Sequence, residues 1–267
     1  MPSGTPEHKE NLLHAMVQML LREIPVEQQI TVLQQPLSPE DRWRSLRNIR
    51  PPKPVSPAYL ELEKEYLQAY HKERGIVNIS SIPNVLPRIR LWRGDITRLP
   101  CDAVVNAANT RLQGCYEPLH HCVDNQIHTL SGIELRNICE KWTRRHNRQL
   151  FLGEAMITDG GNLPAKKIIH TVAPKKEDTF STYDMHTLKQ CYFNSCALAE
   201  EYSCETLAFP CLGTGEFQWP IRISAECAIS AVRQFLSTHQ YPKEVVFCVF
   251  TEEQESVYRE ILENTVE

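Results

Sequence analysis

The sequence contains no long uninterrupted apolar run. No segment approaches the roughly 20 apolar residues that a helix needs to cross a bilayer, and no apolar signal segment opens the chain. An excess of positive charge is also missing, because 29 lysines and arginines stand against 33 aspartates and glutamates, for a formal net charge of -4. Such a chain has no overall field that would attract nucleic acid or an anionic membrane. We therefore expect a cytoplasmic globular protein that binds neither.

The chain has 267 residues, of which 42% are hydrophobic, and this is enough for one large domain with an appendage or for two small domains. It also has ten cysteines. In a reducing cytosol, closely spaced cysteine and histidine indicate metal ligands or catalytic groups rather than disulfides. Scattered cysteines such as Cys139, Cys196 and Cys248 are expected to be small buried apolar residues.

Residues 1–87 differ in pattern from the rest. The stretches 8–24 and 58–75 carry apolar residues at helical spacing. Several prolines between them cannot continue a helix and predict a stiff connection. We interpret residues 1–87 as a helical extension packed on a main domain of residues 88–267, since it shows no cluster of reactive side chains.

From residue 88 onward, short apolar runs alternate with longer helical patterns. The runs RIRLW, DAVVNAA, KKIIHTVA, TLAFPCL and EVVFCVF are typical of strands covered on both faces. Residues 127–142, 188–202 and 224–236 predict helices, and Thr251 to Gln254 form the capping box of a last one. This alternation predicts an α/β/α fold, in which ligands bind beyond the carboxyl ends of the strands.

Three loops after predicted strands carry residues that could bind a ligand. Asp95 in RGDIT could accept hydrogen bonds from a ligand amine or cap a turn. Asn106 and Asn109 in NAAN could contact a ligand or form a turn. The segment GTGEF, Gly213–Phe217, could cradle phosphate with backbone N–H groups, although a plain tight turn has the same pattern.

A fourth loop combines three potential metal ligands. Cys115, His120 and Cys122 have the ligand types and close spacing of a zinc site. Three protein ligands leave one position open, as in catalytic zinc sites. His121 is a possible fourth ligand, but adjacent residues in a tight loop tend to point apart, which favours His120. The alternative is that these are unligated cysteines in a surface loop.

The motifs RGDIT, DAVVNAAN, VDNQIH, KKIIHTVAP and TLAFPCLGTGEFQWP, in this order, resemble the macrodomain family. The resemblance covers residues 88–267 and implies a three-layer α/β/α fold with a mixed central sheet that binds ADP-ribose. Between NAAN and VDNQIH, where a typical hydrolytic macrodomain has a run of glycines, this chain has GCYEPLHHCVDN. That departure resembles a zinc-containing microbial subgroup with a helical N-terminal extension. In that subgroup, residues equivalent to Cys115, His120 and Cys122 hold one zinc ion.

The resemblance also implies a role for each matching residue. Asp95 would bind the adenine amino group with help from the Ile96 backbone, and Phe250 would face adenine unless it is a buried strand residue. Phe217 would pack against the distal ribose, and Asn109 would hydrogen-bond it. Asp124 would be an acid or base, or would orient a zinc ligand. The diphosphate would be wrapped by the backbone of Gly213, Thr214, Gly215 and Glu216.

These roles predict a zinc-dependent hydrolase that removes mono-ADP-ribose from modified proteins by cleaving the bond at the distal ribose, with Asn109 and Asp124 as catalytic residues. One alternative is a reader that binds ADP-ribose without cutting it. Another is a hydrolase of a free derivative such as O-acetyl-ADP-ribose. A nucleic-acid-binding protein with a structural zinc is disfavoured by the net negative charge. The resemblance also suggests a lipoyl-carrier protein as the modified partner.

Overall fold

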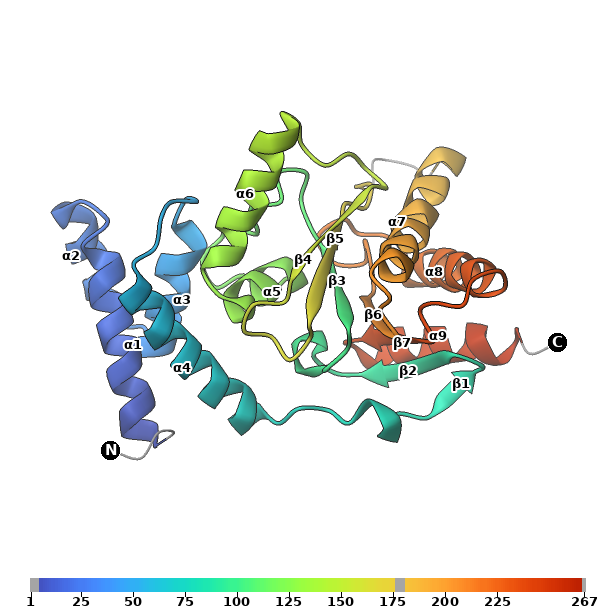
Figure 1. Ribbon diagram of the computed structural model, residues 1–267, viewed down its shortest axis with the longest axis horizontal. Coiled ribbons are helices and arrows are strands. Elements are labelled where there is room, and N and C mark those ends of the chain that lie inside the picture. Colours follow the sequence, from blue (N-terminus) through green and yellow to red (C-terminus); the bar gives the residue numbers. More distant parts are fainter. Residues whose placement is uncertain (1–4, 176–180, 266–267) are drawn as a thin grey trace.

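A mixed sheet of seven strands separates two layers of helices (Figure 1). The computed structural model describes residues 5–175 and 181–265, and all the elements named below lie in this part. The strands are β1 Asn84–Leu86, β2 Ile89–Arg93, β3 Ala103–Ala107, β4 Ala155–Asp159, β5 Lys167–Thr171, β6 Thr206–Pro210 and β7 Glu244–Val249. The helices are α1 Pro6–Leu21, α2 Val26–Gln34, α3 Pro39–Ile49, α4 Pro57–Arg74, α5 Val123–Ser131, α6 Glu134–His146, α7 Thr182–Glu201, α8 Ile221–Leu236 and α9 Glu252–Glu263. The predicted α/β/α class is confirmed.

The order of the strands brings four loops together. The sheet order is β1-β2-β7-β6-β3-β5-β4, and the outer pairs β1–β2 and β4–β5 are antiparallel. The other neighbouring strands are parallel. The carboxyl ends of β2, β3, β6 and β7 therefore lie at one edge of the sheet, and the loops that follow them can form a single site.

Alternate residues of the central strands pack into two different cores. Val104 and Ile168 face the side of α5, α6 and the N-terminal helices. Val105 and Ile169 face the side of α7, α8 and α9. Burial on both faces explains why these strands read as continuous apolar runs, and the five predicted strands are confirmed.

The helices before the sheet share a core with it. Leu12, Met16, Trp43 and Leu67 belong to the same hydrophobic cluster as Ile127 of α5, and in Figure 1 the N-terminal helices lie beside α5 and α6. The division of the chain after residue 87 stays a prediction, and β1 lies on its N-terminal side. No helix in the described part of the chain is both long and apolar enough to span a bilayer.

Some predicted elements were wrong or incomplete. The single helix expected over 127–142 is two helices, because Gly132 has a φ of 112° and interrupts the chain between α5 and α6. The N-terminal region contains α2 and α3 in addition to the two predicted helices. Strands β1 and β4 were also missed. These elements are short or poor in apolar residues, so they give little periodicity.

The cysteines follow the expectation for free thiols. All ten are free, and Cys139, Cys196 and Cys248 are buried. The capping box at Thr251 is present, with the Thr251 side chain and the Gln254 side chain each accepting from the other residue's backbone N–H.

Candidate functional site

The four loops beyond the sheet edge and the start of α5 line one large pocket of about 1110 Å³. This volume suits a ligand of dinucleotide size. Asn106, the first asparagine of NAAN, does not line this pocket. The other predicted site residues do: Asp95, Ile96, Asn109, Cys115, His120, Cys122, Asp124, Gly213, Thr214, Gly215, Glu216, Phe217 and Phe250. The structure brings these residues together, while the role of each stays a prediction.

One part of the pocket combines a carboxylate with an exposed aromatic ring. Asp95 Oδ1 accepts from the backbone N–H and hydroxyl of Thr97, at 2.9 and 2.6 Å, and Oδ2 pairs with Arg74 at 2.5 Å. Burial raises the pKa of Asp95, but the hydrogen bonds from Thr97 and Arg74 outweigh this effect and hold the pKa below its usual range. Asp95 also caps a short turn, Ile96–Arg98, so the turn-capping alternative holds as well.

Phe250 follows β7 and is 76% exposed, so the alternative of a buried strand residue is wrong. The Gln254 side chain accepts the Phe250 backbone N–H at 2.8 Å just beyond the end of the strand, and Phe250 lines the pocket. Gly94 N–H donates to the Val249 carbonyl at 2.9 Å, so Asp95 and Phe250 follow neighbouring strand ends. Together they offer a stacking face and a hydrogen-bond acceptor to a flat base with an amino group.

The glycine loop between β6 and α8 offers backbone donors to the pocket. Trp219 N–H donates to the Gly213 carbonyl at 3.0 Å, so the segment is a tight turn. Within the described residues, no internal hydrogen bond uses the backbone N–H groups of Gly215, Glu216 and Phe217. Free N–H groups lining a pocket near a helix N-terminus favour an anion.

Replacing Gly213 with alanine is expected to destabilise the fold by about 1–3 kcal/mol. Gly213 has a φ of 82°, and a Cβ there would come within 2.6 Å of the Trp219 ring. The matched variant Gly215→Ala places its Cβ in open space and should keep the wild-type unfolding temperature. Thermal unfolding without ligand compares the two variants, and an equal loss in both would contradict the expectation.

Cys115, His120 and Cys122 form a compact group in the same pocket. Their ligand atoms all lie within 4.8 Å of one another, and Cys115 Sγ is 3.4 Å from His120 Nδ1. The other ring nitrogen of His120, Nε2, is 3.2 Å from Glu216 Oε1. A carboxylate behind a histidine fixes the ring and its tautomer, so Glu216 connects the glycine loop to this group. His121 also lines the pocket but does not belong to the group.

The donor set fits zinc. Two thiols and an imidazole are ligands that Zn²⁺ prefers, and three of them leave a position open. Cys122 stands at the N-cap of α5, where its Sγ accepts the Asn125 backbone N–H at 3.4 Å. Burial raises the pKa of the Cys122 thiol to about 12, and a nearby divalent cation would stabilise the thiolate that the site needs.

Asp124 follows Cys122 by two positions and is buried under the two asparagines of NAAN. Asn106 Nδ2 donates to Asp124 Oδ1 at 2.8 Å, and Asn109 Nδ2 lies 3.4 Å from Asp124 Oδ2. Burial raises the pKa of Asp124 to about 6, although both asparagines lower it. Asn106 is a buried strand residue, so the turn alternative is wrong for it, whereas Asn109 does form a turn by accepting the backbone N–H of Arg111 at 3.1 Å.

A second group of potential ligands, His128, Cys139 and His170, is buried. Both ring nitrogens of His170 already have partners, with Asn106 Nδ2 and Thr158 Oγ1 each at 3.1 Å. An ion at this group would break one of these buried hydrogen bonds. We therefore interpret the group as part of the core that supports Asn106.

No motif in the sequence predicts that the N-terminal helices reach the pocket. Arg44 of α3 and Tyr70 and Arg74 of α4 line it, and Arg74 pairs with Asp95. The only local signal is the basic last turn of α4 before Gly75, which equally fits a favourable charge at a helix C-terminus.

The chain is similar in sequence and fold to known proteins, and these similarities are consistent with the pocket described above. The Macro domain family model matches residues 105–228. A protein from Treponema medium named protein-ADP-ribose hydrolase is 34% identical over 251 residues, which cover 92% of this chain and 96% of that protein. This chain belongs to the macrodomain family. A shorter relative of this macrodomain, the O-acetyl-ADP-ribose deacetylase of Escherichia fergusonii, is 38% identical over 66% of this chain and 95% of that protein. A solved structure, the Oceanobacillus iheyensis macrodomain with ADP, is 31% identical and superposes with a TM-score of 0.62 over 69% of this chain and 95% of its own.

Proposed function

We propose that this macrodomain is a zinc-dependent hydrolase that removes mono-ADP-ribose from modified proteins. The observation that carries the proposal is the position of Cys115, His120 and Cys122 in the same pocket as Asn109 and Asp124. A reader needs only a grip on ADP-ribose, whereas an open-sided ligand set next to a buried carboxylate provides groups for bond cleavage.

The extent of the matches favours a protein substrate over a free one. The alignment with the relative named protein-ADP-ribose hydrolase covers 92% of this chain and so includes most of the N-terminal helices. The alignment with the deacetylase covers 66% of it. Since α3 and α4 contribute to the pocket, a relative that shares these helices is the better guide to the substrate. O-acetyl-ADP-ribose remains the second candidate.

In the proposed complex, ADP-ribose lies along the loops. Adenine stacks near Phe250 with its amino group toward Asp95, and the diphosphate accepts from the free N–H groups of Gly215 and Glu216. The distal ribose then lies between Phe217 and Asn109. Contacts remote from the reacting bond supply the binding energy that holds the ribose in register.

Hydrolysis at the distal ribose places positive charge on the sugar and negative charge on the departing group. When bound, zinc would supply Lewis acidity that polarises a substrate oxygen or lowers the pKa of a water molecule. Asn109 would hold a ribose hydroxyl. Asp124, with a pKa near 6, can exchange a proton near neutral pH and is the candidate acid or base.

Three further features belong to the proposal. Each chain binds one zinc ion, the chain divides into an extension of residues 1–87 and a macrodomain of residues 88–267, and the protein acts in the cytoplasm. A lipoyl-carrier protein is the modified partner that the family resemblance suggests.

Phe250→Ala is expected to weaken ADP-ribose binding by about 5–150-fold, corresponding to roughly 1–3 kcal/mol for stacking of a base on an aromatic ring. Because the ring is exposed, the unfolding temperature should stay at the wild-type value. Isothermal titration with ADP-ribose measures the effect, and Tyr183→Ala is the matched control, since that exposed ring lies outside the pocket. Unchanged affinity for Phe250→Ala would place adenine elsewhere.

The proposed function is tested with two substrates presented to zinc-loaded protein. One is a mono-ADP-ribosylated protein, and the other is O-acetyl-ADP-ribose. Release of ADP-ribose with a higher kcat/KM from the protein substrate supports the proposal. A higher value for the free ester supports the second candidate. Tight binding of ADP-ribose without release from either substrate would show a reader.

A further inference from the structure

One side chain of the N-terminal helices fixes the segment Cys115–Cys122, here called the ligand loop. Asn48 of α3 is 3% exposed, and its Oδ1 accepts the backbone N–H of Leu119 at 3.0 Å. Leu119 directly precedes His120 and has a φ of 59°, a left-handed conformation that leucine disfavours. Asn48 therefore stabilises an unfavourable backbone conformation next to a candidate metal ligand.

The same side chain reaches the rest of the loop through Asn125 of α5. Asn48 Nδ2 donates to Asn125 Oδ1 at 3.3 Å, and Asn125 Nδ2 donates to the carbonyl of Glu117 at 3.1 Å. The Asn125 backbone N–H donates to Cys122 Sγ at 3.4 Å. A pair of buried asparagines thus ties the middle of the ligand loop to one of its ligands.

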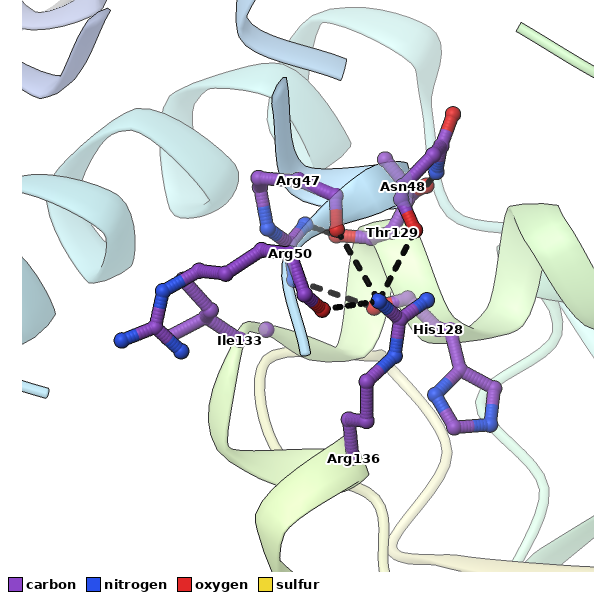
Figure 2. A pocket seen from close by; sticks show the side chains of 8 residues that line it. Arg47, Asn48, Arg50, His128, Thr129, Ile133 and Arg136 are labelled. Atoms are coloured by element: carbon purple, nitrogen blue, oxygen red, sulfur yellow. Dashed lines mark hydrogen bonds between the residues drawn. The ribbon is translucent and has the colours of Figure 1, made fainter. Parts of the chain in front are cut away.

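Two arginines hold α3 in place against α5 and α6. Figure 2 shows Arg136 of α6 directed at carbonyl groups near the end of α3. Its Nη1 donates at 3.2, 2.9 and 2.5 Å to the carbonyls of Arg47, Asn48 and Arg50. In return, Arg47 donates to the carbonyls of His128, at 3.2 Å, and Thr129 near the end of α5. Carbonyls at the C-terminus of a helix lack partners within the helix. Carbonyls near the end of α3 therefore accept from Arg136 of α6, and those near the end of α5 accept from Arg47 of α3.

This contact leaves α3 little freedom to shift. The cavity between the arginines is about 10 Å³, roughly the space that one water molecule needs. Arg136 Nη2 also lies 3.4 Å from the carbonyl of Cys115. Any displacement of α3 would remove acceptors from a buried guanidinium, which is costly. The position of Asn48 relative to the ligand loop is therefore fixed by the fold.

We propose that Asn48 is a positioning residue for the ligand loop, through which the N-terminal helices set the affinity for the metal. The inference rests on the proposed zinc site and adds that the loop is shaped before the ion binds. A preformed loop spares the ordering of flexible residues when the metal binds, so affinity rises without any new ligand.

Asn48→Ala tests this directly. Removing the acceptor should weaken Zn²⁺ binding by about 10–100-fold, the usual effect of losing a group that orients a metal ligand. Competition with a chromophoric chelator measures the dissociation constant. Hydrolysis should return toward the wild-type rate at saturating zinc, because the ligands themselves are unchanged. Zn²⁺ affinity equal to that of wild type would overturn the inference.

Thr129→Val is the matched control. Thr129 is buried; its hydroxyl accepts from Asn48 Nδ2 at 3.5 Å and donates to Asn125 Oδ1 at 3.4 Å, but among the described residues it makes no hydrogen bond with the ligand loop. This variant disturbs the same network and should bind Zn²⁺ as wild type does. An equal loss of affinity in both variants would show general loosening of α5 and would also overturn the inference.

Hydrogen exchange of the wild-type protein tests the inference without depending on whether a variant folds. In metal-free protein, the Leu119 amide should exchange as slowly as amides inside α5, because Asn48 holds it. Fast exchange that slows only after Zn²⁺ is added would overturn the inference. If the wild-type protein binds zinc and hydrolyses the substrate, and Asn48→Ala has the same Zn²⁺ affinity, then the role inferred for Asn48 is wrong and the proposed function stands. If wild type takes up no zinc, the proposed function fails with it.

Discussion

Replacing Cys115 with serine is expected to remove the metal and the hydrolytic activity together. Serine is a poor ligand for Zn²⁺, and the remaining His120 and Cys122 do not complete a site. Zinc content should fall from about one per chain to near zero, and kcat/KM for ADP-ribose release should fall by at least about 100-fold. Elemental analysis and a release assay on the same preparation measure both effects.

The control for this variant is Cys139→Ala. Cys139 belongs to the buried group with His128 and His170, which we interpret as core, so this variant should keep its zinc. ADP-ribose binding should persist in Cys115→Ser, because the adenine and diphosphate contacts lie on other loops. Full turnover by metal-free Cys115→Ser would contradict the proposed mechanism. Loss of zinc in Cys139→Ala alone would move the metal to the buried group.

The central strands can be predicted from the sequence because both of their faces are covered by other parts of the protein. AVVNA of β3 and KIIHT of β5 are buried on both faces, and this burial produces apolar runs that no surface segment imitates. β1 has three residues, too few for any pattern. The edge strand β4 has the mixed composition AMITD and is buried on alternate residues. The length of a strand and the burial of its two faces therefore determine whether its sequence pattern can be recognised.

The site is predictable to the extent that it follows from strand ends. NAAN and RGDIT each include the end of a parallel strand, and GTGEF follows one. The topology must bring the loops beyond these strand ends to one edge. The contacts from α3 and α4 are different. Arg74 reaches the pocket, and Asn48 reaches the ligand loop, only because of how those helices pack. Their local sequence is that of ordinary helix ends. The spacing of residues along the sequence does not reveal contacts that depend on how helices pack in three dimensions.

α3 shows a second limit of sequence patterns. Its residues include Arg47 and Asn48, which composition would place in solvent, yet both are buried. Their partners are mostly backbone carbonyls and amide groups of α5 and the ligand loop. A polar residue can be buried wherever helix ends or loops offer such partners, and a single sequence does not show where these ends will lie.

Asp124→Asn is expected to lower kcat by about 10²–10⁴-fold, the usual contribution of a positioned acid or base. The amide has nearly the same shape, but its nitrogen is a donor, so it can accept from only one of Asn106 and Asn109. It also cannot exchange a proton. Single-turnover release from a modified protein at saturating zinc measures the effect. Affinity for ADP-ribose should change little, because the diphosphate and adenine contacts are untouched. Asp159→Asn, at an exposed carboxylate on β4, is the matched control and should keep full activity.

The two roles open to Asp124 give different results in this variant. A proton-transfer residue leaves zinc content near one per chain and a slow rate that no added metal restores. A residue that only orients Cys122 instead gives weaker zinc binding, about 10–100-fold, and a rate that recovers as zinc is added. The structure favours proton transfer, because Asp124 hydrogen-bonds with Asn106 and Asn109 rather than with Cys122. Recovery of the wild-type rate with excess zinc would contradict that assignment and leave the metal as the main catalytic group.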